Sequence, residues 1–369
     1  MDITLQRSVL FKALQLLNGI VERRQTQPIL ANLLLVAEND QLSLTGTDID
    51  IELVVRIPLL EMKTAGTITV SAKKLFDLCR SLPDDASIHV LLDGAHMICR
   101  AAKSRFNLVT LPAADFPLSA TPLFNTELEI NQLMLKELLG KVHFAMGQQE
   151  VRYYLNGVLL DIHDGTIQCV ATDGHRLALS TMPHVCSHDI KTQVILPRKS
   201  VLELMRLLGN EVDSVVQIHF NENDFRVILP NMVFTSKLIN ASFPAYTRMI
   251  PREAPSAAVM DRDVLRQSLS RSSILLNEKF CCVSLQFSEN LLRLSATNPE
   301  HEEVEEFIPL SYAGPTVELA FNVVYLLDVM SVITSQSIRW SFSDATKGTL
   351  IQAADASDDS LYVVMPVKL

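Results

Sequence analysis

The chain has 369 residues, enough for two or three domains that each bury a core of their own. A hydrophobic fraction of 48% and a charged fraction of 20% exclude a disordered or fibrous protein. No apolar run reaches the roughly 18 residues that a membrane helix needs, and the N-terminus lacks the layout of a signal peptide, so we expect a cytoplasmic protein without membrane contact. The net charge of -10 argues against bulk electrostatic binding of nucleic acid, unless positive charge gathers on one face.

The first predicted element is an amphipathic helix over residues 7–24, with apolar residues at spacings of three and four. A β-hairpin is predicted over Ile29–Asp48, because apolar residues alternate on both sides of a turn-forming segment. A short strand then leads into a second amphipathic helix over 72–82, and alternating segments follow.

The same series of elements recurs twice. Matching hairpins lie at Tyr154–Asp173 and Lys279–Asn298, and each ends 125 residues after the one before. The flanking helices are predicted at 132–146, 198–208, 262–279 and 322–334. The sequence therefore predicts an α+β fold made of three tandem repeats, with boundaries at 1–125, 126–253 and 254–369.

Positive charge is concentrated in the six predicted helices. They contain sixteen Lys and Arg residues against seven Asp and Glu residues, although the whole chain is acidic. If these helices share one side, that side suits a polyanion held through its phosphates. The alternative is that helices simply tolerate Lys and Arg better than turns do. Candidates for direct contact with nucleic acid are Arg23, Arg24, Arg198, Lys199, Tyr153 and Tyr154.

The string Thr172-Asp173-Gly174-His175-Arg176-Leu177 places a carboxylate, an imidazole and a guanidinium close together, which is compatible with acid/base catalysis. However, Asp48 and Asn298 occupy the same repeat position as Asp173, which favours a role in ending the hairpin. His184, His188 and Asp189 have the spacing of a zinc pair but lie in a predicted loop. Nucleotide-binding and hydrolase motifs are absent from the sequence, so we expect no enzyme, cofactor or metal, and we expect the six cysteines to be reduced.

Two charged segments suggest an interface between copies of the chain. Residues 300–306 of the third repeat carry five glutamates, and the first repeat carries Lys74, Lys103 and Arg105. Complementary charge of this kind can orient two subunits. A solvated strand face is the simpler alternative.

Strings from all three repeats resemble the bacterial DNA polymerase III beta subunit family, the DNA sliding clamps. They include TLPAADFP, QEVRYYLNG, VATDGHRLA, PRKSVLELMRLL, FTSKLI, NEKF and YVVMPVKL. The resemblance implies helices on one face of antiparallel sheets, and two chains joined head to tail as a homodimeric ring around duplex DNA. It implies a processivity factor without chemistry of its own, which tethers the replicative polymerase alpha subunit, other polymerases and repair proteins, and is loaded by a clamp loader.

The resemblance also assigns residues to three sites. Partner peptides would occupy a groove formed by Leu155, Thr172, Gly174, His175, Arg176, Leu177, Pro244, Arg248, Met249, Asn322, Tyr325, Val363, Val364, Met365, Pro366 and Val367. DNA contacts would come from Arg24, Arg80, Gln149, Tyr153, Tyr154, Arg198 and Lys199. The dimer interface would join Lys74, Lys103, Arg105, Phe106 and Leu108 to Ile274, Leu275, Glu302, Glu303 and Glu306 of a second chain.

Two hypotheses from other classes stay open at this stage. A hydrolase or transferase would use Asp173 and His175, and its activity would depend on the imidazole. A purely structural scaffold would have no role on DNA, so substitution of Arg24 or Lys199 would have no effect.

Overall fold

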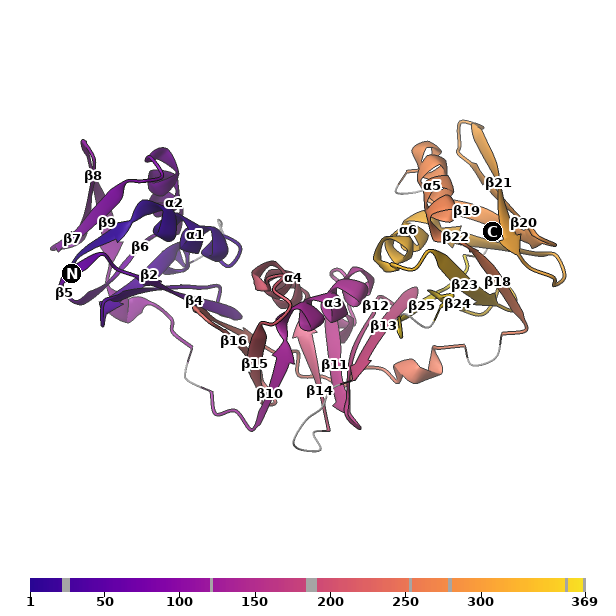
Figure 1. Cartoon of the computed structure of the whole chain (residues 1–369), viewed down its shortest axis with the longest axis horizontal. Helices are drawn as coiled ribbons and strands as arrows, with labels where there is room; N and C mark the ends of the chain where they lie inside the picture. The colour runs from indigo at the N-terminus through magenta and orange to yellow at the C-terminus, as the bar shows by residue number, and fades with distance from the viewer. Residues whose placement is uncertain are drawn as a thin grey trace. The chain divides into compact units, whose positions relative to one another are not determined.

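The computed structural model describes residues 1–21, 27–119, 122–183, 191–251, 254–277, 281–355 and 358–367 (Figure 1). The α-helices in this part of the chain are α1 Arg7–Leu17, α2 Ala72–Ser81, α3 Gln132–Val142, α4 Arg198–Leu207, α5 Arg262–Ser272 and α6 Val323–Val332. The strands of the first repeat are β1 Asp2–Gln6, β2 Asn32–Glu38, β3 Gln41–Thr47, β4 Ile51–Pro58, β5 Glu61–Thr64, β6 Gly66–Ser71, β7 Ser87–Asp93, β8 His96–Ala101 and β9 Ser104–Leu111.

The strands of the second repeat are β10 Thr126–Asn131, β11 Gly157–His163, β12 Thr166–Thr172, β13 Arg176–Pro183, β14 Thr192–Pro197, β15 Val215–Phe220, β16 Asp224–Leu229 and β17 Met232–Lys237. Those of the third repeat are β18 Ser256–Asp261, β19 Cys282–Ser288, β20 Leu291–Thr297, β21 Glu303–Ser311, β22 Val317–Asn322, β23 Ser337–Phe342, β24 Thr349–Ala353 and β25 Leu361–Val364. Each repeat thus contains two helices and antiparallel strands, so the predicted α+β class and the predicted series of elements are confirmed.

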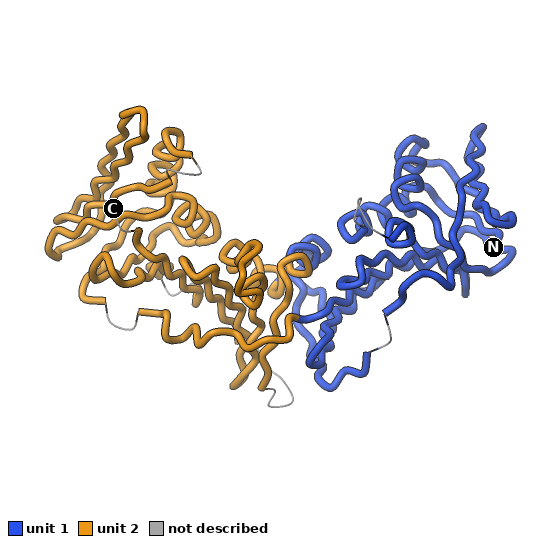
Figure 2. Tube along the Cα trace, turned by 180° about the vertical axis from the view of Figure 1, so that it is seen from behind, with its two compact units in different colours: residues 1–133, 202–238 blue, residues 134–201, 239–369 orange. Residues whose placement is uncertain are grey.

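The chain divides into two compact units, drawn in blue and orange in Figure 2. One unit holds residues 1–133 and 202–238, and the other holds residues 134–201 and 239–369. Each unit has one continuous antiparallel sheet. The strand order is β10-β15-β16-β17-β4-β3-β2-β6-β9-β8-β7-β1-β5 in the first and β14-β11-β12-β13-β25-β24-β23-β18-β21-β20-β19-β22 in the second. The repeat boundaries at 125/126 and 253/254 stay predictions.

The three predicted hairpins are β2–β3, β11–β12 and β19–β20. Two residues connect the strands in each, because Glu38 pairs with Gln41, His163 with Thr166, and Ser288 with Leu291. The alternating apolar residues of the three hairpins are buried, for example Leu44, Cys169 and Leu294 at 0% exposure. Alternation in the sequence therefore identified the core face of these strands correctly.

Predicted helix ends are too late where polar or small residues follow. The helix predicted to reach residue 24 ends at Leu17, and the backbone N–H of the following Asn18 donates to the Leu14 carbonyl at 3.0 Å. Gly19 comes next, and Asn and Gly both have low helix propensity. Likewise α5 ends at Ser272, where the serine-rich segment continues as a short 3-10 helix over Ser273–Leu275. The apolar periodicity of the sequence continues through such segments, whereas the α-helix ends before them.

Helices and sheet form separate layers in each unit. Helix α1 packs against β1, β3 and β4, and α2 packs against β2 and β6. In the other unit α5 contacts β18, β20 and β21, whereas α6 contacts β22 and β25. Helices α1 and α2 also contact one another, as do α5 and α6. Figure 1 shows these helices paired on the same side of their strands, which supports the predicted arrangement of helices on one sheet face.

Candidate functional site

A cavity of about 410 Å³ lies beside the junction of β13 and β25. Its apolar surface comes from Leu177, Val363 and Met365, together with Met249 and Ile250 of the segment that follows β17. Arg248, Lys347, His175 and Arg176 contribute basic or ionisable groups to the lining. An apolar surface bordered by cationic groups suits a short peptide that carries apolar side chains next to acidic groups.

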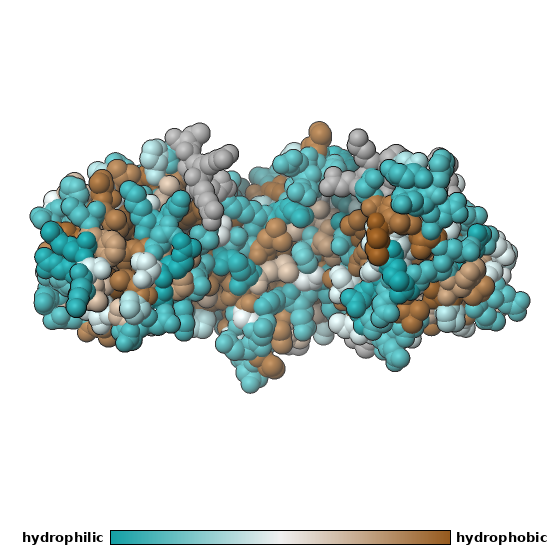
Figure 3. Space-filling model, turned by 90° about the horizontal axis from the view of Figure 1, so that it is seen from above, coloured by the Kyte–Doolittle hydropathy of each residue, from teal (hydrophilic) through white to brown (hydrophobic). Residues whose placement is uncertain are grey.

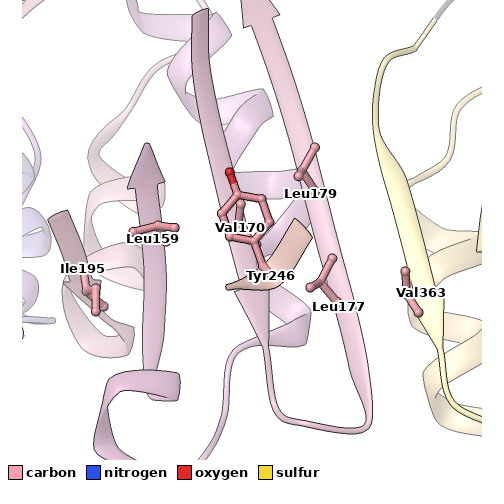
Figure 4. Close-up of a cluster of buried hydrophobic side chains, with 7 residues drawn as sticks. All are labelled: Leu159, Val170, Leu177, Leu179, Ile195, Tyr246 and Val363. Carbon is pink, nitrogen blue, oxygen red and sulfur yellow. The ribbon is translucent and has the colours of Figure 1, made fainter. Parts of the chain in front are cut away.

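The cavity floor is anchored in a hydrophobic core. Leu177 and Val363 are 3% exposed, and they face one another in the register of β13 and β25. Figure 4 shows both in a cluster with side chains from β11, β12 and β14, over which the ring of Tyr246 lies. The backbone N–H of Met365 donates to the His175 carbonyl at 2.9 Å and extends this pairing by one bond. Because the floor belongs to the core, the cavity is preformed.

Arg176 joins the second repeat to the third. Its guanidinium donates to the Asp328 carboxylate of α6 at 2.6 Å, to the Phe144 carbonyl at 2.6 Å and to Asp173 at 3.0 Å. The guanidinium carbon also lies 4.3 Å from the ring centroid of Tyr325, a cation–π distance. The Arg176 side chain is 11% exposed, so its charge is nearly enclosed and fully partnered.

The Asp173 carboxylate has a structural role at the end of the hairpin. One of its oxygens accepts the backbone N–H groups of His175 at 2.9 Å and Arg176 at 3.0 Å, and the other accepts the Arg176 side chain. Asp48 makes the same two backbone contacts, to Asp50 and Ile51, in the first repeat. The His175 ring stacks on the Tyr325 ring, with 6.5 Å between the two ring centroids. Recurrence of this turn favours the hairpin-end interpretation over the catalytic one.

The predicted groove residues divide into two groups. Nine of them line the cavity: Thr172, Gly174, His175, Arg176, Leu177, Arg248, Met249, Val363 and Met365. The others lie outside its lining: Leu155, Pro244, Asn322, Tyr325, Val364, Pro366 and Val367. Among these, Leu155 and Val364 are buried, Asn322 caps α6 by accepting the Val324 N–H at 2.9 Å, and the Val367 N–H donates to Ala320 at 2.8 Å.

Four lining residues were missed by the sequence analysis: Ile250, Pro251, Lys347 and Gly348. Ile250 and Pro251 directly follow Arg248 and Met249, so their position next to predicted groove residues was an available signal. Lys347 and Gly348 lie between β23 and β24, outside the strings that carry the family resemblance. Only the folded arrangement brings that turn to the cavity.

A second cavity of about 700 Å³ lies along β11 and β14 and includes Pro244. The Asp161 carboxylate, 6% exposed, accepts hydrogen bonds from Tyr246 at 2.9 Å and Gln193 at 2.8 Å. Burial, together with this bond to Asp161, raises the pKa of Tyr246. The cluster is satisfied internally and holds Tyr246 over the core of Figure 4.

Five predicted DNA-contact residues lie on two segments that hydrogen bonds hold together. Gln149, Tyr153 and Tyr154 belong to the loop 147–156, and Arg198 and Lys199 begin α4. Asn156 ties the loop to the helix, since its carbonyl accepts the Arg198 N–H at 2.9 Å and its side chain bonds twice to the Glu150 backbone. Tyr153 is 57% exposed, whereas Tyr154 packs against the core cluster. A helix start beside an exposed aromatic side chain can contact phosphate groups.

The remaining candidates lie elsewhere. Arg80 is on the last turn of α2, where it pairs with Asp77 at 2.8 Å. Arg23 and Arg24 lie outside the described residues, as do His184, His188 and Asp189 of the alternative zinc hypothesis. In the described part of the chain, no cluster of three or more His, Cys, Asp or Glu residues could hold a metal.

The cysteines of the described ranges are all free thiols: Cys79, Cys99, Cys169, Cys281 and Cys282. Burial raises the pKa of Cys79, Cys99 and Cys169 to about 12 in each case, so these thiols stay protonated at neutral pH. None of the described helices is long and apolar enough to cross a membrane. The face drawn in Figure 3 is mostly hydrophilic and shows its exposed hydrophobic residues in separate patches.

Large apolar residues of three segments are exposed where the sequence predicts a dimer interface. Val109 of β9 is 60% exposed, Phe307 of β21 is 57% exposed, and Ile274 after α5 is 78% exposed. On β21 the Glu306 carboxylate pairs with Arg271 of α5, and this hydrogen bond lowers the pKa of Glu306 below its ordinary value. Glu302 bonds back to Asn298 at the end of the third hairpin.

Comparison with known proteins agrees with this architecture. The family models for the DNA polymerase III beta subunit match residues 1–120 (N-terminal domain), 129–245 (central domain) and 247–368 (C-terminal domain). A beta sliding clamp from Pseudomonas aeruginosa is 47% identical over the full length of both chains, and one from Escherichia coli K12 is 42% identical, also over both full lengths.

Solved structures give the same result. The DNA polymerase III subunit beta from Pseudomonas aeruginosa superposes with a TM-score of 0.96 at 46% identity, with complete coverage of both chains. Another structure, a sliding clamp from the same organism bound to griselimycin, superposes equally well at 46% identity and full coverage. The fold and its triple repeat define a clamp-type processivity protein.

The chain belongs to the DNA polymerase III beta subunit family, the bacterial sliding clamps. This family comprises processivity factors, not catalytic enzymes, so the acid/base hypothesis for Asp173 and His175 is set aside.

Proposed function

We propose that the chain forms a head-to-tail homodimeric ring that slides on duplex DNA in the cytoplasm and tethers the replicative polymerase through the groove beside β13 and β25. The observation that carries the ring is the pattern of strand junctions between repeats. Strand β4 of the first repeat pairs with β17 of the second, and β13 of the second pairs with β25 of the third. Both junctions use the strand after the hairpin in one repeat and the last strand of the next.

The strands that correspond to these junction strands in the third and first repeats are β21 and β9. Among the described residues, part of each has a neighbouring strand on one side only. Strand β21 is the third counterpart of β4 and β13, and within the described residues Glu303–Pro309 pair on one side only, with β20. Strand β9 is the first counterpart of β17 and β25, and Ser104–Val109 likewise pair only with β8. Open strand edges attract further strands. Pairing of β21 with β9 of a second chain would repeat the internal junction and close the ring.

The internal junction also predicts the register. Val55 faces Met232, and Leu53 faces Phe234. This register can be transferred to β9 and β21 by matching residues that hold the same positions in equivalent hairpins. Ser104 would then face Glu306, Phe106 would face Val304 and Asn107 would face Glu303. This places the basic Arg105 opposite Glu305, and it brings the exposed apolar residues of both edges under cover. The predicted interface residues Lys103, Leu108 and Glu302 continue the same pairing, while Lys74, Ile274 and Leu275 belong to the helical layer.

The groove gives the second half of the proposal. A preformed cavity with an apolar floor and a basic border accepts a peptide at low ordering cost. A polymerase held by such a peptide on a ring would experience a high effective concentration at the primer end. We include other polymerases, repair proteins and a clamp loader among the proposed partners. DNA contact would come from Gln149, Tyr153, Arg198 and Lys199, through phosphates and without sequence preference.

The test is retention on circular DNA. The protein is loaded onto nicked circular plasmid with its cognate loader, the salt is raised, and half of the sample is linearised. Retention on circles combined with loss from linear DNA is the expected result, because a topological link survives salt whereas phosphate contacts weaken. Equal retention on both forms, with loading verified independently, would contradict the ring.

A further inference from the structure

We propose that Arg80 of α2 caps the C-terminal end of α5 in a second copy of the chain, and that this contact, not DNA, is its principal role. The inference deepens the proposed function and rests on the head-to-tail ring. It follows from a contact at the first internal junction, which the third junction should reproduce.

At the first junction, a guanidinium binds the end of a helix from the preceding repeat. Arg206, in the last turn of α4, donates to the carbonyl oxygens of Gln15 at 3.3 Å and of Leu16, both in the last turn of α1. Glu203 orients this guanidinium through a contact of 2.7 Å. A β-carbon on Gly19 would overlap with the Glu203 carboxylate, so the two segments are in close contact.

The second junction brings similar groups together in a different way: its guanidinium belongs to Arg176 of β13, in the same repeat as α3, because the ninth residue of α6 is Ser331. Arg176 donates to the carbonyl of Phe144, just beyond the end of α3, and pairs with Asp328 of α6. Asp328 is the sixth residue of α6, as Glu203 is the sixth residue of α4. The last carbonyls of a helix lack partners within the helix and carry partial negative charge, so a guanidinium is a favourable partner there.

Helix α2 has the equivalent groups in the equivalent places. All three second helices are ten residues long, the sixth residue of α2 is Asp77, and its ninth is Arg80, which corresponds to Arg206. Arg80 and Asp77 form an ion pair of 2.8 Å, as Arg206 and Glu203 do. The side chains of Arg80 and Asp77 are 65% and 43% exposed, so this pair is accessible to a second chain.

The acceptors in the second chain would be the carbonyls of Ser270 and Arg271. They hold the ninth and tenth positions of α5, as Gln15 and Leu16 do in α1. Ser273 already donates to both carbonyls, and each oxygen keeps a second lone pair for the incoming guanidinium. The positive charge of Arg271 is countered by its pair with Glu306.

The same comparison assigns DNA contact on α2 to a different residue. Lys73 is the second residue of α2 and corresponds to Lys199, the second residue of α4. Lys73 is exposed at the opposite end of the helix from Arg80. Lys73 was not among the DNA contacts predicted from the sequence. Lys73 thus provides a matched control of the same charge on the same helix.

The experiment measures dimer dissociation and DNA affinity for the full-length protein, its Arg80→Ala variant and its Lys73→Ala variant. Sedimentation over a dilution series gives the dimer constant, and anisotropy with labelled duplex DNA, at protein concentrations that keep the dimer intact, gives DNA affinity. Arg80→Ala should raise the dissociation constant about tenfold, as expected for loss of charged hydrogen bonds, with unchanged DNA affinity. Lys73→Ala should instead lower DNA affinity and leave the dimer dissociation constant unchanged. Arg80→Lys should fall between wild type and Arg80→Ala in dimer affinity, because it keeps a positive charge near the helix end.

An Arg80→Ala protein with wild-type dimer affinity, or with DNA affinity reduced as much as by Lys73→Ala, would overturn the inference. Either outcome leaves the ring intact provided that the wild-type chain still dimerises. A wild-type chain that stays monomeric at every concentration would instead refute the proposed function itself, so the two failures are distinguishable.

Discussion

Arg176 and Asp328 form an ion pair of 2.6 Å between the second and third repeats, at the border of the candidate groove. Replacement of Arg176 by Ala would leave Asp328 without this partner and the Phe144 carbonyl without its donor. Since Asp328 is about one-third exposed, we expect a loss of about 2 kcal/mol in unfolding free energy, less than for a fully buried pair. Urea unfolding measures this change.

Arg152→Ala is the matched control for Arg176→Ala. Arg152 lies beside the same turn but is half exposed, and its ion pair with Glu150 is longer, at 3.5 Å. Its loss should cost less than about 1 kcal/mol. Equal destabilisation by both variants would contradict the bridging role of Arg176.

Ile49 has a backbone φ of 84°, a conformation that favours glycine, and its counterpart 125 residues later is Gly174 with a φ of 88°. The strain on a β-branched residue here is about 1–2 kcal/mol. Ile49 is 45% exposed, so replacement by Gly sacrifices limited burial. We expect Ile49→Gly to raise the melting temperature in calorimetry. Asp50→Gly, next in the chain at a position without positive φ, should lower it, and the idea fails if both variants are destabilised alike.

Asp358 is held by Lys141 at 2.9 Å and by the backbone N–H of Ser360 at 2.9 Å. Burial by itself would raise the pKa of Asp358, but these partners hold it below its ordinary value. Because the folded-state pKa is depressed, the carboxylate stabilises the fold at neutral pH, and this contribution is lost as pH falls below about 4 through the folded pKa.

We therefore expect Asp358→Asn to lower the unfolding free energy by about 1 kcal/mol at pH 7. The gap between variant and wild type should shrink as pH falls below 4, measured by denaturant unfolding along a pH series. A gap that stays constant down to pH 3 would show that ionisation of Asp358 contributes nothing.

The proposed register of β9 with β21 can be tested with cysteines. Asn107 and Glu303 are both exposed and should face one another across the dimer interface, at a Cβ separation of about 5 Å. Asn107→Cys combined with Glu303→Cys should form a disulfide under mild oxidation, seen as a covalent dimer on a non-reducing gel. The pair Asn107→Cys with Glu305→Cys is two residues out of register and serves as control. Similar cross-linking of both pairs would argue against the register.

Strand β25 and its extension contribute two apolar side chains to the groove lining, Val363 and Met365. Met365 is the more exposed of the two, at 39%. Met365→Ala should weaken binding of a labelled peptide from the cognate polymerase about tenfold, as expected for loss of an apolar anchor. Leu60→Ala, which removes a 60% exposed leucine of the first repeat, should leave binding unchanged. Wild-type affinity in the Met365 variant would remove this residue from the binding surface.

Much of the fold was predictable because three copies of one pattern reinforce each other. Hairpins with alternating apolar residues, such as Leu42 and Leu44, specify which strand face is buried, and the constant spacing of 125 residues places each hairpin. Strand pairing across repeats was not predictable, since the partners of β4 and β13 lie far away in the chain. The same limit explains Lys347, which reaches the groove only through the β23–β24 turn. Helix ends such as Leu17 depend on local capping, which a periodic pattern does not encode.

The position of Leu177 and Val363 gives the groove a thermodynamic role as well. They belong to different repeats, and both line the cavity. A bound peptide therefore favours the paired state of β13 and β25, and by linkage it raises the free energy needed to separate them, by about 2.7 kcal/mol at a ligand concentration 100 times its dissociation constant. Conversely, any strain that parts these strands must release the peptide, because the two affinities are reciprocal. Binding of a partner peptide and pairing of β13 with β25 are thus thermodynamically coupled, so each one stabilises the other.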